Sequence, residues 1–129
     1  MEHSIHYLLM ADHTMLQKLV WNRIKPLGLT TGQPKVLDFL QDHDGAMQKD
    51  IAQGCFLEAG SLTSILNRME ENGLIERKIL NGNRRTFHIF MTEKGKESQK
   101  KVDETFSEIE KQALEGISEE EYALFFEVY

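Results

Sequence analysis

The side chains best suited to recognise a ligand form one polar helix face and one basic turn. Hydroxyl and amide side chains with a single arginine recur over residues 61–68, and two consecutive arginines follow an Asn-Gly-Asn turn. Side chains of these types bond to DNA base edges and phosphates, so the pattern predicts contacts with double-stranded DNA. The predicted DNA-binding residues are Ser61, Thr63, Ser64, Asn67, Arg68, Arg84 and Arg85.

A helix over about residues 60–72 would present this polar face. Its apolar residues recur at positions i, i+3, i+4 and i+7, which predicts a buried stripe opposite the hydrogen-bonding side chains. The stripe consists of Leu62, Ile65, Leu66 and Met69. A short helix over residues 48–54, ending at Gly54, precedes it. The two together form a predicted helix-turn-helix unit.

Two strands follow, over residues 74–80 and 86–91. The second alternates between apolar residues on one side and an outward His88 on the other, which is typical of a strand. The intervening Asn81-Gly82-Asn83 accepts the positive φ angles of a tight hairpin. This order of elements is that of a winged helix-turn-helix, which presents a helix to the major groove and a basic hairpin to the adjacent backbone or minor groove.

Helical patterns flank this lobe on both sides. Another helix opens the lobe, with Thr30 as its predicted cap and Gln33 reaching back. The aromatic residues after Ser118 are too many for a short terminal helix to bury in one chain, which predicts a partner subunit. We therefore predict a mainly α (α+β) chain with a single domain (1–129), a winged-helix lobe (about 30–92) and dimerisation helices (about 1–28 and 93–129).

The composition supports an ordinary globular protein that acts in the cytoplasm. Hydrophobic residues make up 40% of the chain and charged residues 28%, and one cysteine excludes an internal disulfide. No apolar stretch approaches the roughly 20 residues of a membrane span. The net charge of −6 is unevenly distributed: residues 58–96 carry 7 Lys/Arg against 5 Asp/Glu, and residues 97–129 carry 3 against 10. A locally basic lobe can contact phosphates because distant charges are screened.

Some of these residues also have a purely structural explanation. Arg84 and Arg85 could be solvated hairpin charges, and Arg68 could pair with a glutamate of its own helix or with Glu76. Cys55 could be a peroxide-sensing thiol, but no basic neighbour in the sequence lowers its pKa, which favours a small core residue.

Two further groups could serve a sensor. His3, His6 and His13 share a helix face and could seed a metal site. A site needs three or four convergent ligands, so solvated or interface histidines are the favoured interpretation. Met and aromatic side chains could line a ligand cavity or fill a core: Met10, Met15, Trp21 and Phe39. No nucleophile–base pair, phosphate loop or paired metal-ligand motif occurs, so we expect neither an enzyme nor a cofactor.

The ordered set of short motifs along the chain resembles the multiple-antibiotic-resistance-regulator (MarR) family of bacterial winged-helix transcription factors. The matching pieces are Leu29-Thr30 with Gln33 and Val36-Leu37, Ile51-Ala52, Leu62-Thr63, Leu66, Arg68-Met69-Glu70, Gly73-Leu74-Ile75 with Arg77, Asn83-Arg84-Arg85, Ile89, Met91-Thr92 and Gly95. The chain departs from the family pattern at Met47, Glu58, Ser64 and Asn83.

The resemblance implies a homodimer that binds a pseudo-palindromic operator, and a repressor that responds to a small aromatic or anionic effector. It places the effector cleft loosely between the first, second and fifth helices. Two alternatives remain open: a winged-helix protein-interaction module that has lost DNA binding, and a metal-responsive member of the same family.

Overall fold

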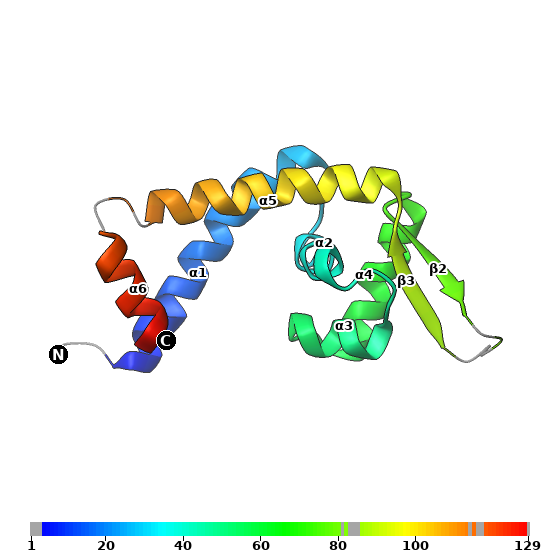
Figure 1. Cartoon of the computed structure of the whole chain (residues 1–129), viewed down its shortest axis with the longest axis horizontal. Helices are drawn as coiled ribbons and strands as arrows, with labels where there is room; N and C mark the ends of the chain where they lie inside the picture. The colour runs from blue at the N-terminus through cyan, green and yellow to red at the C-terminus, as the bar shows by residue number, and fades with distance from the viewer. Residues whose placement is uncertain (1–3, 81, 83–85, 114, 116–117, 129) are drawn as a thin grey trace.

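The computed structural model of the chain describes residues 4–80, 82, 86–113, 115 and 118–128. Helices dominate, and the strands of the described residues form one small sheet (Figure 1). In chain order the elements are α1 (Ile5–Ile24), the 3-10 helix η1 (Lys25–Leu27), α2 (Gln33–Asp42), β1 (Ala46–Met47), α3 (Gln48–Cys55), α4 (Ala59–Glu71), β2 (Ile75–Ile79), β3 (Phe87–Met91), α5 (Glu93–Ala113) and α6 (Glu119–Val128). The predicted mainly α (α+β) winged-helix class is confirmed.

Helix α5 connects the two ends of the molecule. Figure 1 shows it running from the sheet toward α6, with α2 packed beneath its first half and α1 against its second half. An ion pair between Arg23 on α1 and Glu108 on α5 joins the two long helices. None of the helices within the described ranges is long and apolar enough to cross a membrane.

The start of α2 differs from the predicted capping box. Gln33 does reach back, since its Oε1 accepts a hydrogen bond from the Thr30 N–H at 3.2 Å. The cap residue is Gly32, however, whose φ of 91° lies in the left-handed region that a β-carbon disfavours. The prediction that Thr30 caps the helix was therefore wrong. Pro34 lies in the first turn of α2, where a backbone N–H would have no intrahelical partner, so the one it lacks is not missed.

The boundaries of the helix-turn-helix differ from the prediction by a residue or two. Helix α3 continues through Gly54 to Cys55, and its C-cap is Phe56. Gly54 is needed for packing, because a β-carbon there would lie 2.2 Å from the Phe39 ring. Gly54 as the helix end was therefore wrong.

The sheet contains a strand that sequence reasoning missed. The strand order is β1-β3-β2 and both pairings are antiparallel. Two residues form β1, and Ala46 pairs with Ile89 at the centre of β3. Strands β2 and β3 are shorter than predicted, since Leu74, Leu80 and Thr86 lie outside them. Gly82, in the predicted hairpin turn, has a φ of 71°, as such a turn requires.

One hydrophobic core holds the lobe to the long helices. Leu62, Leu66 and Met69 of α4 are fully buried in it, together with Ile89 of β3 and Val102 of α5. This core fixes the orientation of α4 relative to the sheet, so the opposite face of α4 is the surface that the lobe presents.

Candidate nucleic-acid interface

Helix α4 exposes the predicted hydrogen-bonding residues. Three of its four stripe residues are fully buried and Ile65 is partly buried. The exposed face carries Ser61, Thr63, Ser64, Asn67 and Arg68, all within one continuous helix. Hydroxyl and amide groups on an outward helix face have the chemistry of major-groove recognition.

The hydroxyl of Thr63 is already used inside the protein. It donates to the Ala59 carbonyl at 2.9 Å and accepts from the Gln48 amide nitrogen at 2.7 Å. Because Gln48 begins α3, this pair ties the first helix of the unit to the second. Thr63 thus has a structural role that the sequence did not reveal, and its methyl group is the part left free to contact a base.

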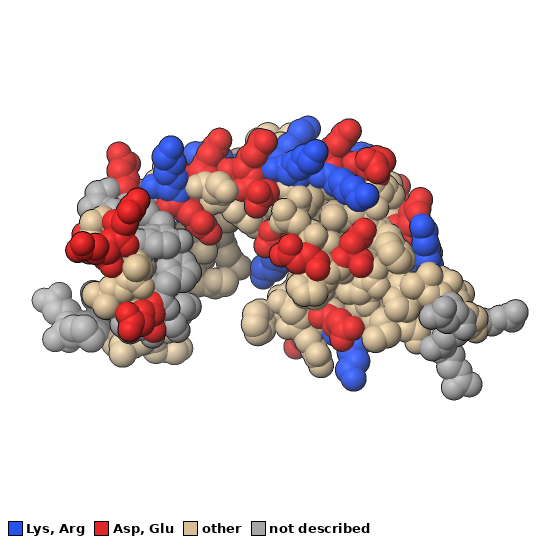
Figure 2. Space-filling model, in the orientation of Figure 1, with Lys and Arg blue, Asp and Glu red and all other residues tan. Residues whose placement is uncertain are grey.

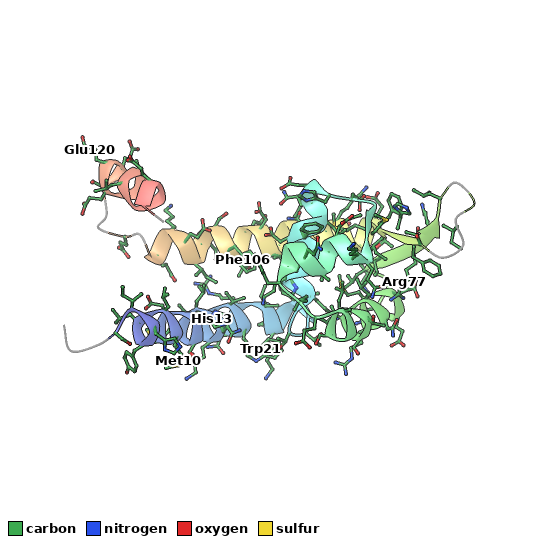
Figure 3. All side chains as sticks on the ribbon, turned by 90° about the horizontal axis from the view of Figure 1, so that it is seen from below. Met10, His13, Trp21, Arg77, Phe106 and Glu120 are labelled. Atoms are coloured by element: carbon green, nitrogen blue, oxygen red, sulfur yellow. The ribbon has the colours of Figure 1, made fainter. Side chains whose placement is uncertain are left out.

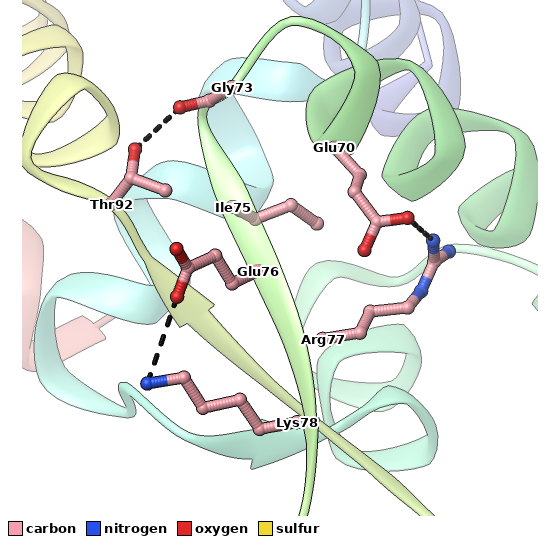
Figure 4. A pocket seen from close by; sticks show the side chains of 7 residues that line it. All are labelled: Glu70, Gly73, Ile75, Glu76, Arg77, Lys78 and Thr92. Carbon is pink, nitrogen blue, oxygen red and sulfur yellow. Dashed lines mark hydrogen bonds and ion pairs between the residues drawn. The ribbon is translucent and has the colours of Figure 1, made fainter.

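Asn67 is held by an arginine on the neighbouring strand. Arg77 of β2 donates through Nη2 to the Asn67 Oδ1 at 2.9 Å and through Nη1 to the Glu70 Oε1 at 3.0 Å. Only 15% of the Arg77 side chain is exposed, against 46% for Glu70. Figure 4 shows the Arg77–Glu70 pair beside β2, in a groove of about 510 Å³. The sequence marks Arg77 only as part of a family motif and does not indicate its contact with Asn67.

Of the three arginines predicted to contact DNA, the structure describes Arg68 but not Arg84 or Arg85. Arg68 forms no ion pair with Glu70, Glu71 or Glu76 in the described part of the chain, since Glu70 pairs with Arg77 and Glu76 with Lys78. Arg84 and Arg85, like the neighbouring Asn83, lie outside the described residues. Their role at the hairpin stays a prediction.

Comparison with known proteins places this arrangement in a family. A sequence profile of the MarR family matches residues 27–86. The organic hydroperoxide resistance transcriptional regulator of Bacillus subtilis (strain 168) is 30% identical over 128 residues, covering 97% of this chain and 87% of that protein. The chain belongs to the MarR family of transcriptional regulators.

Solved structures of MarR-family proteins share the fold over nearly the whole chain. The transcriptional regulator SlyA superposes with a TM-score of 0.90 at 25% identity, covering 98% of this chain and 89% of that one. MepR of S. aureus, solved as a complex with DNA, superposes with a TM-score of 0.83 at 28% identity, covering 96% and 91%. The winged-helix fold of a transcriptional regulator is therefore shown.

Both helices of this MarR-family unit begin without a side-chain cap. Met47 precedes α3 and Glu58 precedes α4, and neither side chain bonds to a backbone N–H of the helix that follows. The free N–H groups of a helix start carry partial positive charge, which favours phosphate. Glu58 puts a carboxylate close to that position on α4, so an approaching phosphate would meet a like charge.

The turn between α3 and α4 displays a side chain that sequence reasoning missed. Phe56 is 95% exposed, and its φ of 56° is left-handed. For a residue with a β-carbon this backbone costs roughly 1–2 kcal/mol. Its amide N–H bonds to the Ala52 and Gln53 carbonyls, which closes α3.

Cys55 is a buried residue of the lobe. Its thiol donates to the Lys35 carbonyl at 3.4 Å. Burial raises the pKa of the Cys55 thiol, and the positive charge of Lys35 offsets this rise only in part. A raised pKa keeps the sulfur protonated and unreactive, which agrees with the predicted core role.

The histidines are placed in three different settings. His6 and His13 are exposed on α1, His3 lies outside the described residues, and the described chain contains no group of three potential metal ligands. His43 stacks on Phe39 with ring centroids 4.4 Å apart. His88 lies on the face of β3 opposite the buried Ile89, but it is half-buried there, and its Nδ1 lies 2.7 Å from the Gly45 carbonyl.

The residues considered for a ligand cavity do not converge. Met10, Met15 and Trp21 are exposed along α1, and Figure 3 shows Met10 and Trp21 on the edge of this helix that faces away from α5. Phe39 instead packs partly buried against the core. The three α1 residues are therefore neither core nor cavity lining within one chain.

Charge on the molecule follows the uneven distribution in the sequence. Figure 2 shows lysines mixed with acids along α5, whereas α6 carries acidic side chains without a basic one. A polyanion would therefore be repelled by the α6 end, which leaves the lobe as the more favourable side for approach.

Proposed function

We propose that this MarR-family regulator binds a pseudo-palindromic DNA operator as a homodimer and represses transcription until a small effector releases it. The observation that carries the DNA-binding part is the polar outer face of α4 above its fully buried apolar stripe. The similarity to MepR, whose structure contains DNA, supports the same mode of binding.

The DNA contacts would divide into two kinds. Ser61, Ser64 and Asn67, with the methyl group of Thr63, would contact base edges in the major groove. Arg68, Arg84 and Arg85 would contact phosphates, which position the protein without reading sequence. The basic hairpin would then lie on the backbone or minor groove beside α4.

The homodimer is supported by apolar side chains that one chain leaves uncovered. Ile5, Leu9, Leu16 and Leu19 of α1 are each half exposed or more, along one face of the helix. Contiguous exposed apolar surface of this kind marks an interface. A second copy covering it through a two-fold axis would pair two lobes, as a palindromic site requires. In this proposal the interface is formed by residues of about 1–28 and 93–129. The dimer would act in the cytoplasm of a bacterial cell.

A small anionic or aromatic effector would bind between α1, α2 and α5. Gln33 on α2 and Gln99 on α5 are buried, and each has an amide nitrogen without an acceptor among the described residues. Such donors would suit an anionic group, because an unpaired buried donor costs free energy until an acceptor arrives. The Bacillus subtilis relative is named for hydroperoxide resistance, but the buried, protonated Cys55 does not suit oxidant sensing.

The test is selection from a random duplex pool by the purified protein at two salt concentrations. We expect enrichment of a roughly palindromic site and a steep loss of affinity with added salt. Absence of an enriched site, with retention that salt does not change, would support the protein-interaction module instead.

The wing assignment has a separate test in Arg85→Ala. Losing one phosphate contact should weaken binding to all sequences alike and reduce the salt slope by about 1. Lys18→Ala, which removes a positive charge from α1, serves as the control and should leave the slope unchanged. An unchanged affinity and slope for Arg85→Ala would contradict the role of the wing.

A further inference from the structure

We infer that Arg77 is a positioning residue that sets which base Asn67 recognises, an inference that rests on the proposed DNA binding. The starting point is the hydrogen bond from the Arg77 guanidinium to the Asn67 amide, at 2.9 Å. This bond joins a strand residue to the outer face of the recognition helix, although Arg77 itself lies mostly beneath the surface.

The chemistry of the guanidinium decides which way the amide is turned. Arginine has five N–H donors and no acceptor, so only the amide oxygen of Asn67 can face it. The oxygen therefore lies on the side of β2, and the NH2 group occupies the other corner of the amide. Asn67 is exposed, so this corner with its two donors is available to a ligand.

Glu70 keeps the guanidinium in place. It lies three residues after Asn67, on the adjacent turn of α4, and its carboxylate binds the second nitrogen of Arg77 at 3.0 Å. A planar guanidinium that bonds two acceptors on neighbouring helix turns loses rotational freedom in both its own side chain and theirs. Asn67 therefore presents a fixed orientation before any DNA arrives.

A pair of donors selects among the four bases. In the major groove guanine offers two acceptors, N7 and O6, and thymine offers O4, whereas adenine offers one acceptor, N7, beside a donor, and cytosine offers only a donor. An asparagine that binds adenine uses its oxygen and nitrogen together, and here the oxygen is turned toward Arg77. Asn67 would therefore prefer an acceptor edge, guanine above all, over adenine or cytosine.

The experiment compares the base preferences of five purified proteins selected from the same random duplex pool. They are the wild type, Asn67→Ala, Asn67→Asp, Arg77→Met and, as a matched control, Lys78→Met. Lys78 follows Arg77 in the same strand and pairs with Glu76, so its loss removes a charge without touching α4. Thermal unfolding of each variant checks that it is folded.

We expect Asn67→Ala to reduce a preference for guanine or thymine, from about tenfold to about twofold, at one symmetric pair of positions. Arg77→Met should relax the same positions without changing the salt slope, since Arg77 would not touch phosphate. Asn67→Asp replaces the donors by an acceptor, so preference there should move to cytosine. Lys78→Met should reproduce the wild-type profile.

Three results would overturn the inference: adenine or cytosine preferred at the Asn67-dependent positions of the wild type, an unchanged profile in Arg77→Met, or a flatter salt slope in that variant. If Arg77→Met does not fold, the Asn67→Asp result decides, because an unchanged preference would contradict the orientation of the amide. Failure of the proposed function would differ from all of these, because the wild type itself would then enrich no site.

Discussion

Helices α1 and α4 are both rich in apolar residues, but most of those in the α4 stripe are buried, whereas most of those in α1 are exposed. In α4 the residues at positions 62, 66 and 69 are fully buried, and polar side chains cover the opposite face. Helix α1 has 20 residues, and Ile24 is the single residue of the helix that is buried. Ile5, at the other end, is 68% exposed. The apolar residues of α4 therefore form one stripe that fills the core of the chain, whereas those of α1 lie around the helix and are mostly exposed.

This difference assigns the two helices to two tasks. Helix α4 is complete within the lobe, so its orientation is set before the protein meets DNA. In the proposed dimer a second copy would cover the exposed apolar side chains of α1, and each one buried would contribute at most roughly 1.5–3 kcal/mol to the association. Stability of the lobe should thus be independent of protein concentration, whereas pairing of lobes should depend on it.

The largest expected effect comes from a charge placed on the exposed apolar face of α1. Leu16→Glu should convert the dimer to a monomer and lower affinity for a palindromic duplex at least about 100-fold, because bivalent binding is lost. Analytical ultracentrifugation and a DNA titration measure the two effects. Thr14→Glu adds the same charge on the opposite side of the helix and should leave both unchanged. If Leu16→Glu remained a dimer, the exposed apolar face of α1 would not be the interface.

A smaller effect is expected from two glycines in contrasting surroundings, one in α4 and one at the start of α5. A β-carbon on Gly95 would lie 2.0 Å from the Leu74 carbonyl oxygen, whereas one on Gly60 in α4 meets nothing within 4 Å. Gly95→Ala should lower the free energy of unfolding by about 3 kcal/mol. Gly60→Ala should raise it by about 0.5–1 kcal/mol, since alanine favours the helix.

Urea unfolding at several protein concentrations measures both glycine variants. The shifts in unfolding free energy should be the same at each concentration, since neither contact involves α1. A loss in Gly95→Ala that disappears at high concentration would mean that the lobe also depends on the partner.

The smallest effect is expected at the contact between α2 and α5. Helix α5 also packs against α1, so it links α2 of the lobe to the N-terminal helix. Burial raises the pKa of Asp38 above 3.8, and the negative charges of Asp103, Asp42 and Glu110 raise it further. The ionised carboxylate is therefore less favourable in the folded state, and this penalty is complete only above the raised pKa. It disappears as the pH falls below about 3.8, where Asp38 is protonated in both states.

Asp38→Asn should consequently stabilise the fold near pH 7, by no more than about 0.5 kcal/mol, because Asp38 is only partly buried and solvent screens its charge. Thermal unfolding at neutral and acidic pH measures the gain, which should vanish in acid. Asp103→Asn should give part of the same gain. A variant that is less stable than wild type at pH 7 would contradict this assignment of the charges.

The sequence was sufficient for features that depend on local periodicity. The buried stripe of α4, the exposed residues opposite it and the turn at Gly82 follow from residue spacing and φ preference alone. The contact of Arg77 with Asn67 joins residues ten positions apart on different elements, so no local pattern indicates it. The pairing of β1 with β3 and the close approach of Gly95 to Leu74 depend in the same way on tertiary packing.

In the proposed assembly, two copies joined through α1 place their two α4 helices on one palindromic site. The most direct test measures the stoichiometry and affinity of the protein on the selected palindromic duplex and on a duplex carrying half of it. We predict two chains per palindromic duplex and an affinity for the half-site at least about 100-fold lower. One chain per duplex, bound equally well to the half-site, would contradict this assembly.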